Sequence, residues 1–369
     1  MAKTWKSKQA KDWYNSRPWL VGCNYAPRTA SNQLEMWQAE TFSPDVIREE
    51  LGWAKSLGMN TIRVFLHDLL WKQDSKKFLK RIDTVFGIAK KNGIGVMPVF
   101  FDSVWHPFPH LGTQADPEPG VHNSRWTQSP GVAILQDEKR FDALKEYVVG
   151  VVKHFADDDR VQIWDVWNEP DNPNAMSYGL RDLGDRKGEV VAKLLPRVFD
   201  WVRSAKPSQP LTCGIWLGDW SSDETFKPHE RVQVENSDLI SFHCYGPADD
   251  AERRVQQLQR FGRPLLCTEY MSRGSGSTFE TVLPVFQKHR VGAYNWGFVA
   301  GRTQTNYPWD SWQRPYEQEP QPWFHEVFRA DGSAYRQEEV DVIRELTRAT
   351  NQTAAPKPAG QKKRVRATS

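Results

Sequence analysis

The chain has 369 residues, of which 39% are apolar and 26% charged, a composition typical of ordinary globular proteins and unlike that of disordered or membrane proteins. Its 49 Lys and Arg residues nearly balance 46 Asp and Glu residues, and the net charge of +3 is too small to indicate a nucleic-acid partner. Residues 1–19 carry charges and tryptophans where an export signal needs an apolar core, so we expect a cytoplasmic protein without a membrane partner.

Short apolar runs rich in β-branched residues alternate along the chain with stretches of helical period. In chain order these runs are 19–25, 61–67, 95–101, 161–167, 211–216, 239–245, 264–270 and 292–299. Such alternation is expected of a parallel sheet with crossover helices, and eight strands close a barrel. We therefore predict a single-domain α/β protein with a (β/α)8 TIM barrel.

Helix signals lie between these runs. The Ser-Pro-Asp sequence at 43–45 predicts a helix that ends at Gly58, and the Asp-Ser pair at 74–75 predicts one that ends at Gly93. Residues 1–18 form an N-terminal extension, which we expect to pack as a short helix across the bottom of the barrel.

Two Pro- and Gly-rich stretches, 103–131 and 302–322, are too long to be simple connections. They follow the third and the eighth apolar runs, so we expect them at the C-terminal end of the barrel, where active sites lie. The barrel domain spans residues 19–349, and the basic segment 350–369 is predicted to be a disordered tail.

Cysteine and aromatic usage bear on the environment and the ligand. Every cysteine lies within an apolar run, which predicts buried free thiols and fits a reducing cytoplasm; the four are Cys23, Cys213, Cys244 and Cys267. The chain also has 17 tryptophans and 10 tyrosines. Flat amphipathic rings stack on the C–H faces of sugars, which indicates a carbohydrate ligand, although a large core would also use many of them.

Two glutamates stand at the ends of predicted strands. Glu169 follows the fourth run in the sequence Trp-Asn-Glu-Pro, and Glu269 stands near the end of the seventh in Cys-Thr-Glu-Tyr. Because the C-terminal ends of barrel strands face one cavity, both carboxylates would meet there. Glycoside hydrolysis needs such a pair, one group to protonate the leaving oxygen and the other to attack or to activate water. This chemistry requires neither a cofactor nor a metal.

Further residues follow the strands in the order of a known family. From about residue 19 to about residue 347 the chain resembles glycoside hydrolase family 5, within the clan of retaining barrels, on five matches: Arg63, Asn168-Glu169-Pro170, His243-Cys244-Tyr245, Glu269 and Trp296. The resemblance implies an enzyme that hydrolyses O-glycosidic bonds with net retention. Its partner would be an oligosaccharide or disaccharide substrate.

The resemblance also implies a role for each matching residue. Glu269 would be the nucleophile and Glu169 the general acid/base. Arg63 and Tyr245 would donate hydrogen bonds to Glu269 and lower its pKa relative to that of Glu169. The remaining matches would bind or support the substrate: Asn168 at the sugar 2-hydroxyl, Trp296 as the floor of the cleaved sugar's subsite, and His243 beside the acid/base.

The third run departs from cellulase-like members, which carry a histidine near its end. This chain has Asp102 there, followed by Trp105, which is closer to mannan-acting members, and Asp102 would bind hydroxyls of the cleaved sugar. The segments 32–38 and 295–305 resemble subfamily 18, which implies an exo-β-mannosidase acting on Man-β-1,4-GlcNAc from N-glycan cores. Other candidates for binding or supporting the substrate are Trp105, Trp126, Trp216 and Gln304, and the loops that carry Trp105, Trp126, Trp309 and Trp312 would wall off one end of the cleft.

The residues leave other interpretations open. Within the same family the chain is also compatible with an endo-β-mannanase, a β-glucanase or a transglycosylase. A noncatalytic sugar-binding barrel is a further alternative, although both glutamates are present. His106, His110 and His122 share one loop, but they lack a metal-binding motif, and we expect a structural or sugar-contacting role for them. The oligomeric state is not indicated by the sequence.

Overall fold

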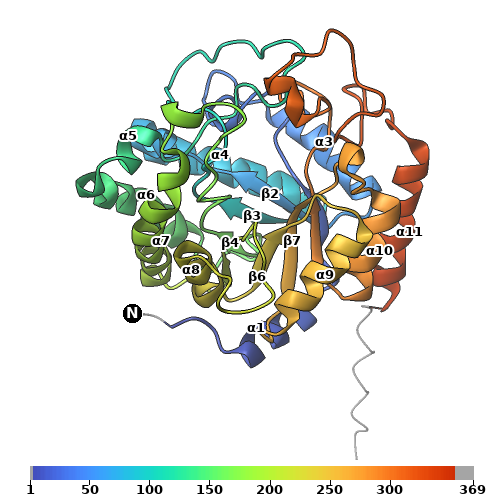
Figure 1. The fold of residues 1–369 in the computed structure, drawn as a ribbon. Coiled ribbons are helices and arrows are strands. Elements are labelled where there is room, and N and C mark those ends of the chain that lie inside the picture. Colours follow the sequence, from blue (N-terminus) through green and yellow to red (C-terminus); the bar gives the residue numbers. More distant parts are fainter. Residues whose placement is uncertain (1–2, 354–369) are drawn as a thin grey trace, which may run out of the picture.

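A computed structural model of the protein describes residues 3–353, and eight parallel strands form its centre (Figure 1). The strands are β1 (Val21–Asn24), β2 (Thr61–Phe65), β3 (Gly95–Val99), β4 (Trp164–Asp165), β5 (Leu211–Thr212), β6 (Ile240–His243), β7 (Leu265–Tyr270) and β8 (Gly292–Asn295). Each strand lies inside one of the eight predicted runs, so the (β/α)8 barrel is confirmed. The runs extend beyond the strands because pairing is interrupted there and continues only as isolated bridges, as at Val161 and Ile215.

The sheet closes on itself. Its strand order is β5-β4-β3-β2-β1-β8-β7-β6, and Ile215 joins the two ends by a parallel bridge to Phe242. The Ile215 N–H donates to the Ser241 carbonyl at 3.1 Å, and the Ile215 carbonyl accepts from the His243 N–H at 3.0 Å. Because all pairs are parallel, the C-terminal ends of the strands form one rim of the barrel.

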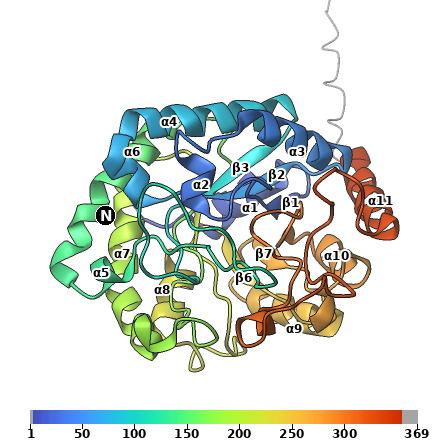
Figure 2. The same ribbon diagram turned by 90° about the horizontal axis from the view of Figure 1, so that it is seen from above.

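Helices surround the strands, as the view from above shows (Figure 2). They are α1 (Ser7–Asn15), α2 (Gln33–Trp37), α3 (Pro44–Ser56), α4 (Asp68–Lys91), α5 (Val132–Leu135), α6 (Lys145–Phe155), α7 (Lys187–Ser204), α8 (Pro228–Asn236), α9 (Ala248–Gln259), α10 (Phe279–Lys288) and α11 (Gln337–Thr353). Their inner faces and the strands form one large apolar core. The strands are buried on both faces, which is why their sequences are continuous apolar runs.

Helix α4 begins earlier than predicted. It begins at Asp68, where the His67 side chain accepts a hydrogen bond from the Leu69 N–H at 3.2 Å. The predicted start, Asp74, lies inside the helix and has an extended backbone. Its Oδ1 accepts from the Lys77 N–H at 3.0 Å, so the helix-starting signal is real but marks a kink between two helical segments.

The bottom of the barrel is closed by α1, which lies below the strands in Figure 1. Ala10 and Tyr14 of this helix are buried and pack against residues at the N-terminal strand ends: Leu20, Met97, Ile163, Leu239, Leu266 and Tyr294. The Tyr14 hydroxyl also donates to the Arg290 carbonyl at 2.9 Å. Side chains therefore fill the space between α1 and the strands at the bottom of the barrel.

The opposite rim carries the long loops. Residues 103–131 and 302–322 cover the top of the barrel and approach each other across its mouth (Figures 1 and 2). All four cysteines are buried free thiols, as predicted. No helix among residues 3–353 is long and apolar enough to span a bilayer. Residues 354–369 of the predicted tail lie outside the described part of the chain.

Candidate active site

A cavity of about 410 Å³ opens at the C-terminal rim of the barrel. This volume lies in the usual range for small-molecule sites. The cavity is lined by Val104, Trp105, His122, Asn168, Glu169, Asn172, Pro173, Asn174, Ala175, Met176, Trp216, Leu217, Tyr245, Glu269, Trp296 and Trp309. It therefore contains both predicted catalytic glutamates.

The two glutamates face each other across this cavity. A carboxylate oxygen of Glu169 and one of Glu269 lie within 4.8 Å of each other, and the two residues are only 7% and 5% exposed. Glu269 belongs to β7, whereas Glu169 follows β4 in a left-handed backbone conformation with φ of 40°. Such a conformation is unfavourable for a residue other than glycine and is characteristic of functional sites.

Glu269 is held by two donors. The Arg63 Nη1 donates to its Oε1 at 3.0 Å, and the Tyr245 hydroxyl donates to its Oε2 at 2.7 Å. Burial raises the pKa of Glu269 and a charge on Glu169 raises it further, whereas the Arg63 charge and the Tyr245 hydrogen bond lower it. A cation and a hydroxyl both stabilise the ionised form of Glu269, so these contacts favour Glu269 as the charged member of the pair.

Glu169 has weaker partners. Its Oε1 lies 2.8 Å from the His243 Nδ1, and its Oε2 accepts a hydrogen bond from the Asn172 amide at 2.6 Å. Burial lowers the pKa of His243 to about 4, so this imidazole is neutral at neutral pH. Burial raises the pKa of Glu169 to about 7, and the Asp171 charge opposes its ionisation as well. Glu169 is thus suited to donate a proton near neutral pH.

Beneath the glutamates, Arg63 connects four strand ends. Besides Glu269, its guanidinium donates to the Asp165 carboxylate at 2.9 Å. It also donates to the side-chain oxygens of Asn24 and Asn168, at 2.9 and 2.7 Å. Arg63 is completely buried, and its planar fork of donors matches these separate acceptors. The network fixes both Glu269 and Asn168 relative to the barrel.

Asp102 lies beside Asn168 and is occupied by protein donors. Its Oδ1 accepts from the Asn168 amide at 3.1 Å and from the Val104 N–H at 2.9 Å. Its Oδ2 accepts from the Trp126 indole at 2.6 Å and from the Gln33 amide at 3.3 Å. In this arrangement Asp102 positions Asn168, and its predicted contact with sugar hydroxyls stays a prediction.

Aromatic rings form the walls of the cavity. Trp105 stacks on Trp312 with ring centroids 5.1 Å apart, and Trp309 meets Tyr245 edge to face at 5.0 Å. Trp105 has a φ of 67°, a second unfavourable backbone conformation at the cavity. These rings offer flat apolar surfaces of the kind that sugars contact.

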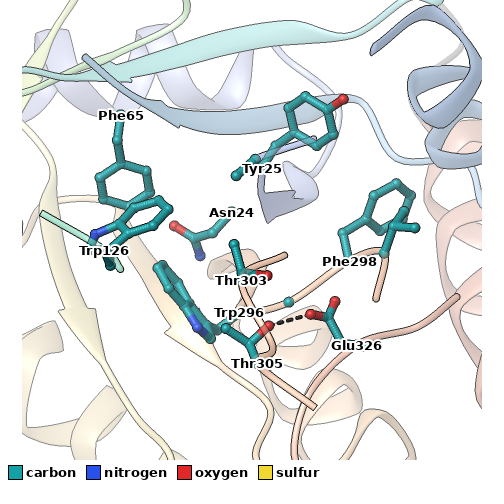
Figure 3. Close-up of a pocket in the computed structure, with 12 residues that line it drawn as sticks. Asn24, Tyr25, Phe65, Trp126, Trp296, Phe298, Thr303, Thr305 and Glu326 are labelled. Atoms are coloured by element: carbon teal, nitrogen blue, oxygen red, sulfur yellow. Dashed lines mark hydrogen bonds between the residues drawn. The ribbon is translucent and has the colours of Figure 1, made fainter. Parts of the chain in front are cut away.

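Trp296 separates the main cavity from a second, smaller one, because it lines both. Figure 3 shows this second cavity, in which Trp296 meets Trp126 and Phe65 edge to face at 5.7 and 5.9 Å. The far side carries Glu326, whose carboxylate accepts a hydrogen bond from Thr305 (Figure 3). Of the sequence-predicted residues, Trp126 therefore supports the Trp296 ring from behind.

The two long loops are joined to each other over the cavity. The Gln304 amide donates to the Glu118 carbonyl at 2.7 Å, and its side-chain oxygen accepts from the Gly120 N–H at 3.2 Å. Two backbone hydrogen bonds also join the loops. The Asn123 N–H donates to the Thr303 carbonyl at 2.8 Å, and the Tyr316 N–H donates to the Gly120 carbonyl at 3.0 Å. Gln304 thus acts in the structure as a bridge between the loops.

Sequence reasoning missed several residues of the site. Asp171 and Asn172 lie two and three positions after Glu169, and their only signal was this proximity. His122 lines the cavity and binds the Tyr307 carbonyl through Nδ1 at 2.8 Å. The sequence identified it only as one of three histidines in a loop.

One group of acidic and histidine side chains among the described residues is compact enough to hold a metal ion. It consists of Glu169, His243 and Glu269, which are the candidate acid/base, its neighbour and the candidate nucleophile. The adjacent Arg63 cation occupies Oε1 of Glu269 and disfavours a second positive charge there. The three histidines of the 103–131 loop do not form such a group in residues 3–353.

Comparisons with known proteins agree with this geometry. Residues 30–300 match a family model described as cellulase, glycosyl hydrolase family 5. No curated protein gave a match.

Among solved structures, a GH5_18 variant from Streptomyces cattleya in complex with Manβ1-4GlcNAc has a TM-score of 0.60 at 14% identity, with 94% of this chain and 83% of that chain covered. An exo-β-1,4-mannosidase from Opitutaceae bacterium strain TAV5 has a TM-score of 0.59 at 19% identity, with 91% and 60% covered. An endo-1,4-β-D-mannanase from Thermotoga petrophila has a TM-score of 0.55 at 14% identity, with 89% and 99% covered. At these identities the similarity establishes the fold.

Proposed function

The chain belongs to glycosyl hydrolase family 5 and is a glycoside hydrolase, and from this premise we propose that it is a retaining exo-β-mannosidase that cleaves Man-β-1,4-GlcNAc. The observation that carries the retaining mechanism is the separation of the two carboxylates. One oxygen of Glu169 and one of Glu269 lie within 4.8 Å of each other. Retaining enzymes place the two groups about 5 to 5.5 Å apart, whereas inverting enzymes need about 6.5 to 9.5 Å to admit a water molecule.

In the first step Glu269 attacks the anomeric carbon. The bond from this carbon to the leaving oxygen breaks as a bond to the Glu269 carboxylate forms, and the proton of Glu169 moves to the leaving oxygen. Arg63 and Tyr245 hold Glu269 ionised and aimed for this attack. Asn168, fixed by Arg63 and Asp102, faces the cavity and would bind the sugar 2-hydroxyl in the transition state.

In the second step water replaces the enzyme at the anomeric carbon. Glu269 is now an uncharged ester, so the pKa of Glu169 falls and its carboxylate accepts a proton from the attacking water. The oxygen of water bonds to the anomeric carbon as the ester bond breaks and Glu269 regains its charge. Two displacements at one carbon restore the β configuration.

The shape of the cavity supports removal of a terminal sugar. The sugar that becomes attached to Glu269 would stack on Trp296, and the two joined loops contribute Trp105, His122 and Trp309 to the lining of the cavity. The leaving sugar would lie at the side of Glu169, where Trp216, Leu217 and Met176 line the cavity. Leu217 and Met176 are large apolar side chains that are 57% and 47% exposed. These two side chains at the cavity are the apolar surface that we propose for the leaving sugar.

The mannoside specificity is supported by two kinds of similarity. The segments 32–38 and 295–305 resemble subfamily 18, and several structural neighbours carry the designation GH5_18, one of them in complex with Manβ1-4GlcNAc. A further neighbour is an exo-β-1,4-mannosidase. The four buried free thiols support action in a reducing cytoplasm.

The test is hydrolysis of Man-β-1,4-GlcNAc beside mannobiose, cellobiose, mannan and para-nitrophenyl β-glycosides, with the products followed by NMR. We expect β-mannose as the first product, chiefly from Man-β-1,4-GlcNAc. Initial release of α-mannose would contradict retention. Internal cleavage of mannan would replace the exo assignment with an endo-β-mannanase, and activity on gluco-configured substrates alone would contradict the mannoside specificity.

A further inference from the structure

An acidic residue two positions after Glu169 takes no part in the mechanism above. The Asp171 Oδ1 accepts a hydrogen bond from the Trp216 indole at 3.0 Å, and its Oδ2 lies 3.0 Å from the His229 Nε2. We propose that the His229–Asp171 pair is a positioning device for the leaving group, which fixes Trp216 as the platform of the leaving sugar and keeps a negative charge beside Glu169. This inference rests on the proposed glycosidase function and extends it to three residues.

The pair is built from three separate parts of the barrel. Asp171 follows β4, Trp216 follows β5, and His229 lies in the first turn of α8. The side chains of Asp171 and His229 are only 11% and 8% exposed. Gly188 of α7 packs against the imidazole, because a Cβ atom at this position would lie 2.8 Å from two ring atoms of His229. This close contact restricts the orientation of the His229 ring.

Trp216 is the member of this group that faces the substrate. It lines the cavity on the side of Glu169, next to Leu217 and Met176. Its indole N–H points to Asp171 and is not available to a sugar, so the ring can offer only its face. A ring held by one hydrogen bond at its polar edge is suited to stack on the apolar C–H face of a pyranose.

The charges around Asp171 favour its ionised form. Burial works to raise its pKa, but the hydrogen bonds of His229 and Trp216 outweigh burial and lower the pKa below its usual range. Asp171 also interacts electrostatically with four other titratable groups. These are Lys187 of α7, Glu230 of α8, the Cys213 thiol after β5 and Glu169. Asp171 is therefore already charged when Glu169 titrates.

A fixed negative charge disfavours ionisation of a neighbouring carboxyl group. Glu169 also faces the Arg63 and Lys187 cations, which lower its pKa, together with the neutral His243 and the Glu269–Tyr245 pair. Burial is the main reason why the pKa of Glu169 is raised, and Asp171 adds to it. Asp171 thus acts on the position of the leaving sugar, through Trp216, and on the pKa of Glu169, which protonates the leaving oxygen.

The first experiment uses Asp171→Asn, which preserves shape and an acceptor for Trp216 but removes the charge. The pH profile of kcat/KM is measured on an aryl glycoside whose weakly acidic leaving group needs protonation by Glu169. Its sugar is the one that the wild-type enzyme cleaves fastest, so the profile stays readable if the mannoside specificity fails. We expect the basic limb to move to lower pH by about 0.5 to 1 unit. Asp185→Asn, which removes an exposed carboxylate from the same β4–α7 connection, is the control and should leave the limb in place.

The second experiment tests the platform. For His229→Ala and Trp216→Ala we expect kcat/KM on the disaccharide to fall by about tenfold relative to the aryl glycoside, the scale of one aromatic contact. His229→Gln, which can again donate to Asp171, should recover most of this loss. If Asp171→Asn fails to fold, Asp171→Ala, which also removes the charge, takes its place in the pH profile. Trp216→Phe tests the platform with Asp171 intact. This variant keeps a ring but lacks the indole donor, and it should lower the disaccharide-to-aryl ratio without moving the pH limb.

An unchanged basic limb in Asp171→Asn would overturn the electrostatic part of the proposal. A wild-type disaccharide-to-aryl ratio in His229→Ala or Trp216→Phe would overturn the platform. Failure of the proposed function has a different signature, since the wild-type enzyme itself would then release the wrong sugar or the wrong anomer.

Discussion

The pKa of Glu169 should depend strongly on the charge of Glu269, and Glu269→Gln isolates this dependence. The variant removes the charge but keeps the shape, as the ester of the intermediate does. With one oxygen of each group within 4.8 Å and an effective dielectric constant of about 20, the repulsion between two charged carboxylates is about 3.5 kcal/mol. At about 1.4 kcal/mol per pKa unit this corresponds to roughly 2.5 units.

We therefore expect the pKa of Glu169, which burial raises to about 7 in the wild-type protein, to be lower in Glu269→Gln by up to about 2.5 units. The unpaired Arg63 cation would act in the same direction. The assay is a titration of ¹³C-labelled glutamate carboxyl groups by NMR, with the Glu169 signal assigned from its loss in Glu169→Gln. Glu280→Gln, at an exposed position of α10, controls for the change in net charge. A Glu169 pKa within 0.5 unit of the wild-type value would refute the coupling between the two groups.

Three further predictions follow from the same geometry. Glu169 must be protonated in the first step, and its pKa is raised to about 7, so kcat/KM should be highest below this pH and should fall as the pH rises through about 7. A fall in kcat/KM only above about pH 9 would contradict the assignment of Glu169 as the acid. Glu269→Ala should lose turnover by at least about a thousandfold, and azide should restore part of it on an activated glycoside and yield an α-glycosyl azide detectable by NMR; near-normal activity without azide would exclude Glu269 as nucleophile. Glu169→Ala should retain far more activity on aryl glycosides with acidic leaving groups than on the disaccharide, since these need little protonation, and equal losses on both would contradict its role.

The strands and both glutamates could be predicted because their signals are local. A parallel strand buried on both faces is a continuous apolar run, and the parallel arrangement brings every C-terminal strand end to one rim. Glu169 and Glu269 were therefore placed together although 100 positions separate them. The true start of α4 was missed because Asp74 is a genuine helix-starting residue, and no local signal shows that Asp68 begins a helical segment before it.

Contacts between loops could not be predicted in this way. The sequence places Asp102 at the rim, but it does not reveal that Trp126 and Gln33, from distant segments, occupy its Oδ2. The Asp171 contacts with Trp216 and His229 are equally remote in sequence and depend on where the β4 and β5 loops turn. Such pairings are set by tertiary packing and leave no periodic pattern in the chain.

The joined loops also constrain how the enzyme can be redesigned. Gly120 fits against the Tyr316 carbonyl so closely that a Cβ atom would lie 1.9 Å from its oxygen, and His122 donates its N–H to the Ser311 hydroxyl at 2.9 Å. A graft that replaced residues 103–131 alone would leave the partner groups of 302–322 without their acceptors and donors. Chimeras with new specificity should therefore exchange both segments together, as one cassette drawn from a single parent.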